Sequence, residues 1–125
     1  MSIRYKGHEQ YPDSILIREF TGKVDVHEII KSWDYLLNNQ LITPKTKGVI
    51  NNLGNCELNM SMEDFAALMD YLKSHPNLKR LKLAVICDNP KIIIFPIMGE
   101  FKQKDLTIKP FTTEKAAVSW IVEDE

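Results

Sequence analysis

The sequence predicts a single α/β domain, built on a mixed, mostly parallel sheet of four to five strands with about four helices. Strand-like apolar segments alternate along the chain with segments whose apolar residues recur at helical spacing. That alternation is typical of parallel strands joined by helical crossovers. The length of 125 residues is that of one domain, so residues 1–125 are expected to form one unit. The predicted order is ββαβαβαβα.

The first part of the chain is predicted to form an antiparallel hairpin and a helix. The strands are residues 3–7 and residues 14–20, and Thr21-Gly22 closes the second one. Asp25 is then a suitable N-cap for a helix, with Glu28 as its capping-box partner. The apolar stripe of this helix comprises Val26, Ile29, Ile30, Trp33, Leu36 and Leu37.

The middle of the chain predicts a short strand, a loop and a second helix. Residues 48–53 form a short buried strand, and residues 54–60 form a polar loop beyond it. Ser61 is a good N-cap for the next helix, which ends at His75-Pro76. The buried stripe of that helix comprises Phe65, Leu68, Met69 and Leu72.

The last part of the chain predicts two more strands and a closing helix. Residues 81–87 form the most apolar strand, which indicates cover on both faces, as in a central parallel strand. Residues 106–111 suit a sheet edge, because Pro110 cannot donate to a ladder. The closing helix begins at Thr112 or Thr113, and its stripe comprises Ala116, Ala117, Trp120 and Ile121.

Three segments resemble SpoIIAA-like proteins, which are relatives of STAS domains and of CRAL-TRIO lipid-binding domains. Residues 15–29, ILIREFTGKVDVHEI, resemble the strand, glycine turn and first helix of that family. Residues 83–90, LAVICDNP, and residues 106–121, LTIKPFTTEKAAVSWI, resemble its last strands and closing helix. The resemblance covers most of the chain and implies a STAS/SpoIIAA-like fold. Because these motifs serve packing, it is more specific for fold than for function.

The resemblance also draws attention to Ser61. In STAS domains that act as anti-sigma-factor antagonists, a serine that starts the helix after the third strand is phosphorylated within an Asp-Ser-Ser-Gly motif. Ser61 occupies the matching place, but neither the preceding aspartate nor the glycine is present. Glu63 and Asp64 would oppose an added phosphate. Plain helix capping by Ser61 is therefore favoured over phosphorylation.

Composition excludes several classes of function. The formal charge is −1, from 16 basic and 17 acidic residues, and basic clusters of the kind that bind nucleic acid are missing from the sequence. The apolar run at residues 92–98 is far shorter than the roughly 20 residues of a membrane-spanning helix. Two cysteines and a polar N-terminus predict a cytoplasmic protein. No metal-ligand or phosphate-binding spacing occurs, so no metal or cofactor is expected.

Topology predicts one pocket beyond the carboxyl ends of the parallel strands, where ligands tend to bind. A redox pair or thiol nucleophile there is one interpretation. No basic residue in the loop is an obvious activator of a thiolate, so inert thiols and turn-forming polar residues are favoured. The residues of this predicted pocket are Asn52, Asn55, Cys56, Cys87 and Asp88.

The segment KIIIFPIMGEF, residues 91–101, is predicted to form a third helix that Asn89-Pro90 opens. Pro96 either kinks this helix or begins it, and in the second case residues 91–95 are irregular. One apolar stripe can cover the sheet. The opposite side is either an interface or is covered by the tail or a neighbouring loop. That side comprises Ile92, Phe95, Pro96 and Gly99.

Together these features predict a non-enzymatic binding or regulatory domain that acts through protein–protein interaction, as a homodimer that uses the third helix. The alternative is a carrier or sensor of a small apolar, lipid-like ligand held between the third helix and the sheet, as the relationship to lipid-binding domains implies. A third hypothesis is an enzyme that uses Cys56 or Cys87.

Overall fold

The computed structural model describes residues 2–87 and 106–123. They form a five-stranded sheet of order β1-β2-β3-β4-β5, in which β1 is antiparallel to β2 and the other neighbours are parallel. The α/β class, the mostly parallel sheet and the opening hairpin are therefore confirmed. The strands are β1 (Ser2–Gly7), β2 (Ile15–Asp25), β3 (Gly48–Asn59), β4 (Lys82–Ile86) and β5 (Thr107–Phe111), and the helices are α1 (Val26–Asn38), α2 (Met62–Lys73), α3 (Pro76–Lys79) and α5 (Glu114–Val122).

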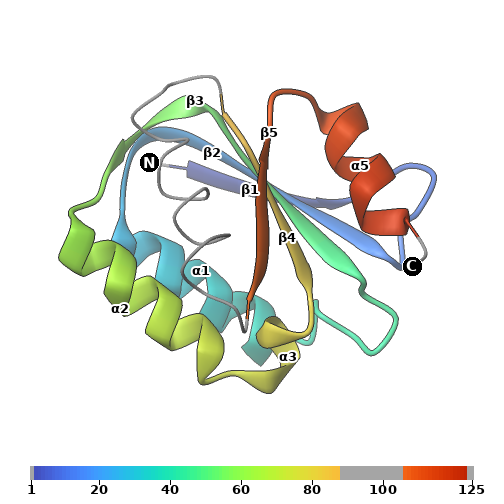
Figure 1. Ribbon diagram of the computed structural model, residues 1–125, viewed down its shortest axis with the longest axis horizontal. Coiled ribbons are helices and arrows are strands. Elements are labelled where there is room, and N and C mark those ends of the chain that lie inside the picture. Colours follow the sequence, from blue (N-terminus) through green and yellow to red (C-terminus); the bar gives the residue numbers. More distant parts are fainter. Residues whose placement is uncertain (1, 88–105, 124–125) are drawn as a thin grey trace.

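The helices cover both faces of the sheet. Helices α1, α2 and α3 lie on one face and α5 lies on the other (Figure 1). Successive residues of a strand point to opposite faces, so Val49 and Leu83 enter the core beneath α1 and α2, while Ile50 and Ala84 enter a smaller core beneath α5. Strand β4 is central and β5 lies at the edge, both as predicted.

The two long helices of the larger core are built as their periodicity predicts. Trp33 and Leu36 of α1 are almost wholly buried, as are Met69 and Leu72 of α2. Pro76 ends α2 and also opens the one-turn helix α3, which the sequence did not predict and which buries Leu78 completely.

Helix α5 meets the sheet through a narrower stripe than predicted. Ala117 and Ile121 are buried, but Ala116 is exposed and Trp120 is only partly buried. This helix is short and packs over β3, β4 and β5, so only this pair of residues, four apart, is fully buried, while Val118 and Trp120 pack against the same cluster as partly buried side chains.

Strands β2 and β3 run further than the sequence predicts. The prediction closed one strand at Thr21-Gly22 and made residues 54–60 a loop, and both expectations are wrong. The register of β2 against β3 shifts between Glu19 and Thr21, Gly22 adopts a positive φ of 81°, and pairing then continues. Glycine makes this conformation accessible, and the continued ladder satisfies backbone groups that a loop would leave to water.

The extra length forms a two-stranded extension, here called the terminal ribbon, which comprises residues 22–25 of β2 and 56–59 of β3. In the described ranges, the β1 pairing reaches only Thr21 and the β4 pairing reaches only Asn52. The ribbon therefore projects past both neighbouring strands. It leads directly into the two long helices, because Asp25 is the N-cap of α1 and Ser61 is the N-cap of α2.

Gly48 marks the closest approach of β3 to its surroundings, and the substitution Gly48→Ala tests that packing. A Cβ there would lie 2.7 Å from the Lys82 carbonyl oxygen and 2.8 Å from a methyl group of Ile121. We expect the free energy of unfolding in urea to fall by about 2 kcal/mol, since backbone cannot easily move aside. Gly54→Ala is the control, because its nearest contact is the Asn52 side chain at 3.2 Å. Equal losses in the two variants would contradict this account.

Candidate functional site

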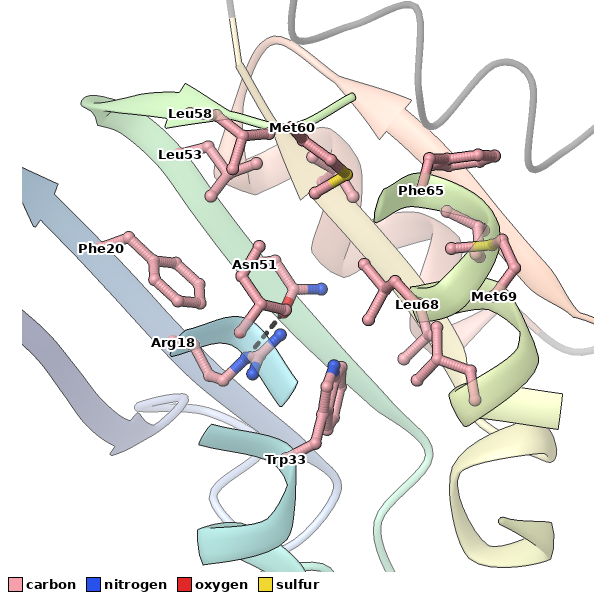
Figure 2. Close-up of a pocket in the computed structure, with 15 residues that line it drawn as sticks. Arg18, Phe20, Trp33, Asn51, Leu53, Leu58, Met60, Phe65, Leu68 and Met69 are labelled. Carbon is pink, nitrogen blue, oxygen red and sulfur yellow. Dashed lines mark hydrogen bonds between the residues drawn. The ribbon is translucent and has the colours of Figure 1, made fainter. Parts of the chain in front are cut away.

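An apolar pocket of about 80 Å³ lies between the sheet and helices α1 and α2 (Figure 2). Its walls come from strands β2 to β5, from both helices and from Met60, which lies between β3 and α2. All of its lining residues are apolar except Arg18 and Asn51. The apolar side chains labelled in Figure 2 are Phe20, Trp33, Leu53, Leu58, Met60, Phe65, Leu68 and Met69.

The guanidinium of Arg18 is the buried charge of this pocket. Arg18 lies on β2 between Ile17 and Glu19, and alternation along the strand turns its side chain toward the larger core. It is 2% exposed. Its Nε donates to Asn51 Oδ1 at 2.8 Å, and its Nη1 donates to Ser32 Oγ at 2.9 Å. Figure 2 shows the first of these bonds.

Aromatic rings and a polar network hold this guanidinium in place. Its central carbon lies 3.8 Å from the centroid of a Trp33 ring and 4.9 Å from that of Phe20. Arginine stacked on aromatic faces gains cation–π attraction, which is stronger where water is excluded. Asn51 is itself fixed, because its Nδ2 donates to the Ala84 carbonyl at 2.9 Å. The Ser32 hydroxyl also lies 2.8 Å from the hydroxyl of Tyr5.

The electrostatic state of Arg18 follows from its surroundings. Burial lowers its pKa to about 9, against an opposing effect of Tyr5 and Tyr71. The side chain therefore remains protonated at neutral pH. In the described part of the chain no carboxylate forms a salt bridge with it, and the ion pair found there joins Lys6 and Glu19. The site thus holds a positive charge whose hydrogen-bonding and ring partners are neutral.

Tyr71 lies close to the same charge and binds a carboxylate. Its hydroxyl donates to Asp34 Oδ1. Burial, followed by this hydrogen bond, raises the pKa of Tyr71 well above its ordinary value. The phenol therefore stays neutral, and its hydroxyl is used in the hydrogen bond to Asp34.

Of the described residues of the predicted strand-end pocket, Asn52 and Cys87 lie near the end of the β3–β4 pairing. Asn55 and Cys56 lie within β3, because this strand continues to Asn59. Asn52 Oδ1 accepts from the Gly54 amide at 3.0 Å, but both residues lie within β3, so the turn expected from the sequence does not form there. Asn55 is exposed, and Asp88 lies outside the described residues. Ligand binding at this end stays a prediction.

The two cysteines are thiols in different surroundings. Cys87 is 1% exposed. Cys56 is half-buried, and its Sγ lies 3.5 Å from the Leu53 carbonyl oxygen as a donor. Burial raises the pKa of the Cys56 thiol. A raised pKa leaves less thiolate at any given pH, and the thiolate is the reactive form.

Alkylation by iodoacetamide tests the chemistry of Cys56. We expect the native thiol to react more slowly than glutathione at pH 8, and its rate to rise at higher pH than that of glutathione, because its pKa is raised. Mass spectrometry of the modified peptides assigns each rate to Cys56 or Cys87. Protein unfolded in urea is the control and should react at both sites. A native Cys56 faster than glutathione would restore the enzyme hypothesis.

Ser61 caps helix α2 in a full capping box. Its Oγ accepts from the Asp64 amide at 3.1 Å, and its own amide donates to Asp64 Oδ2 at 3.0 Å. The N-cap was predicted, and the reciprocal bond from Asp64 is an addition. The Asp64 carboxylate, which accepts from the Ser61 amide, is thus one of the acidic groups that would repel a phosphate on Ser61. Modification of Ser61 stays a prediction.

Substitution of Ser61 measures the capping role. Ser61→Ala removes the acceptor for the Asp64 amide, so we expect the free energy of unfolding to fall by about 1 kcal/mol. Ser61→Asn supplies another good N-cap acceptor without adding a charge beside Asp64, and it is the matched control. Chemical unfolding followed by circular dichroism provides both values. A loss of the same size in the two variants would exclude capping as the main role.

The sequence did not single out Arg18 or Asn51. A signal was present, because each is a polar residue in the middle of a strand segment predicted to be buried. The predicted interface at Ile92, Phe95, Pro96 and Gly99 lies outside the described residues.

The strand order, the pairing and the helices on both faces define a mixed α/β fold of the SpoIIAA-like type. An uncharacterized DUF3478-family protein from Shewanella loihica PV-4, described as having a SpoIIAA-like fold, shares 17% identity at a TM-score of 0.63 and covers 96% of this chain and 92% of its own. Unphosphorylated SpoIIAA, an anti-sigma factor antagonist, shares 11% identity at a TM-score of 0.61 over 96% of this chain and 97% of its own.

Phosphorylated SpoIIAA, a Bacillus cell fate determinant, gives 10% identity and a TM-score of 0.55 over 96% of this chain and 99% of its own. No family model and no curated protein matches the sequence. The TM-scores of 0.55 to 0.63 establish the fold, as the resemblance predicted. Among the described residues, no helix is both long and apolar enough to cross a membrane.

Proposed function

We propose that this protein is a non-enzymatic binding domain that acts through protein–protein interaction, and that its first partner is a second copy of itself. The terminal ribbon is the observation that carries this proposal. In the described ranges, β3 has no strand partner beyond Asn52 on the side that faces β4. A strand edge with unpaired amides and carbonyls is a template for pairing with another chain.

The position of the ribbon supports a regulatory role. Its strands lead into the N-termini of both long helices, and Ser61 lies two residues beyond Asn59, the last residue of β3. A partner that pairs with this edge would lie next to the capping box of Ser61. A charge change at Ser61 would then act directly on the interface. The anti-sigma factor antagonist SpoIIAA has the same fold.

A second copy is a suitable partner because pairing about a two-fold axis is isologous and uses the same edge on both subunits. Glu57 and Asn59 on this edge are exposed. Lys23, which is paired with Glu57 across the ribbon, is exposed as well and offers the opposite charge. The predicted third-helix surface is the other place where a homodimer can form.

Sedimentation and hydrogen–deuterium exchange test this proposal together. We expect the mass to rise from 14.5 kDa toward twice that value with concentration, and amide exchange in residues 54–59 to slow at the same concentrations. A monomer at every concentration would contradict the homodimer. Protection at residues 92–99 instead, with loss of the dimer in Phe95→Glu, would move the interface to the predicted third-helix surface.

The pocket favours a second candidate function, a carrier or sensor of a small apolar ligand. Its 80 Å³ cavity is bounded by apolar side chains of the sheet, α1 and α2. Small-molecule sites typically combine such walls with few polar groups that fix orientation. Here the polar groups are Arg18 and Asn51.

A further inference from the structure

We propose that this pocket binds a short-chain monocarboxylate and that the ligand carboxylate pairs with the buried guanidinium of Arg18. The proposal rests on the second candidate function and names its ligand class. It is independent of the homodimer, because the cavity lies within one subunit.

The hydrogen-bond inventory of Arg18 leaves donors for a ligand. A guanidinium has five N–H groups and no acceptor. The described residues accept two bonds, one from Nε to Asn51 and one from Nη1 to Ser32. Nη2 has no acceptor among them. The second hydrogen of Nη1 and both hydrogens of Nη2 therefore remain for the two oxygens of a carboxylate, which arginine can bind in a bidentate manner.

The charge of the site selects a monoanion. A cation removed from water is costly unless an opposite charge accompanies it. The groups that touch the guanidinium, namely Asn51, Ser32, Trp33 and Phe20, are neutral. One negative charge cancels that of Arg18. A dianion such as hydrogen phosphate would bring a surplus charge into apolar walls, so a carboxylate is the better fit.

The size and walls of the pocket select a short apolar tail. Leu53, Leu58, Met60, Phe65 and Leu68 bound the cavity, and methionine side chains adapt easily to different shapes. A cavity of about 150 Å³ accommodates benzene. The 80 Å³ here is about half of that volume, and because the pocket is partly open, a short carboxylate with a tail of about three carbons fills it and reaches its opening.

The site is preorganised. Asn51 binds both the Arg18 side chain and the Ala84 carbonyl, so the guanidinium is held by a residue that is itself tied to β4. The contact with the Trp33 ring restricts the orientation of the guanidinium group. A ligand then loses little binding free energy in ordering the protein. A purely structural arginine would also be held this way, and the ligand titration separates the two roles.

Titration of the full chain with sodium butyrate tests the proposal. The readouts are tryptophan fluorescence, to which Trp33 and Trp120 both contribute, and backbone NMR shifts, which resolve the two positions. We expect saturable binding with shifts at Arg18, Asn51 and Trp33. Butanamide, which has the same shape without the charge, should bind at least roughly tenfold more weakly. Across acetate, butyrate, hexanoate and octanoate, affinity should peak at butyrate. No saturable binding by any of these acids would overturn the proposal.

Two variants separate the ligand role of Arg18 from folding. Arg18→Lys keeps the charge but removes the planar guanidinium that can bind a carboxylate in a bidentate manner, so we expect roughly tenfold weaker butyrate binding. Met60→Trp leaves Arg18 intact at a half-buried position and fills the cavity, so binding should also weaken while circular dichroism is unchanged. Butyrate affinity equal to wild type in both variants would overturn the proposal.

Inorganic phosphate and the oligomer measurement complete the test. Phosphate binding as tight as butyrate would show that Arg18 attracts any anion, an outcome that contradicts carboxylate selection. The titrations are run at the lowest and highest concentrations used for sedimentation. A monomer that binds butyrate refutes the homodimer alone, and a dimer that binds no carboxylate refutes the pocket proposal alone.

Discussion

The stacking of the Arg18 guanidinium on Trp33 joins the elements of the larger core. Arg18 belongs to β2, Trp33 to α1 and Asn51 to β3, and Asn51 continues the connection to β4 through the Ala84 carbonyl. A buried cation costs several kcal/mol unless its surroundings compensate. The helix α1 must therefore present Trp33 and Ser32 at one height above the sheet. The positions of Trp33, Ser32 and Asn51 therefore all depend on the need to compensate the buried charge of Arg18.

Local patterns were enough to predict most of the fold. The 3.6-residue spacing of α1 and α2, the apolar run of β4 and the proline of β5 each have a direct physical meaning, and the topology follows from their order. The prediction failed where tertiary pairing overrides local chemistry. Gly22 and the polar residues after Leu53 are typical of turns, yet β2 and β3 continue through them because each provides the other with a ladder.

The candidate site was harder to predict for the same reason. Asn52, Asn55 and Cys56 were singled out because a strand was expected to end after Leu53. Strand β3 instead continues to Asn59, and ligand binding at these residues stays a prediction. Arg18 was missed because arginine in a strand is ordinarily exposed, and its burial depends on Trp33 and Asn51, which lie 15 and 33 positions away in the sequence. Residue spacing carries no information about such a meeting of three elements. A buried strand that contains adjacent polar residues, such as Asn51 and Asn52, is the pattern that would have indicated it.

The division of the core into two halves has an evolutionary consequence. Ile50, Ala84, Ala117 and Ile121 hold α5 against one face of the sheet, while the pocket lies wholly on the other face. Substitutions that reshape one side therefore leave the other side's packing intact. Such a sheet can exchange its binding chemistry many times over and keep its architecture, which accounts for a shared fold at 10% to 17% identity.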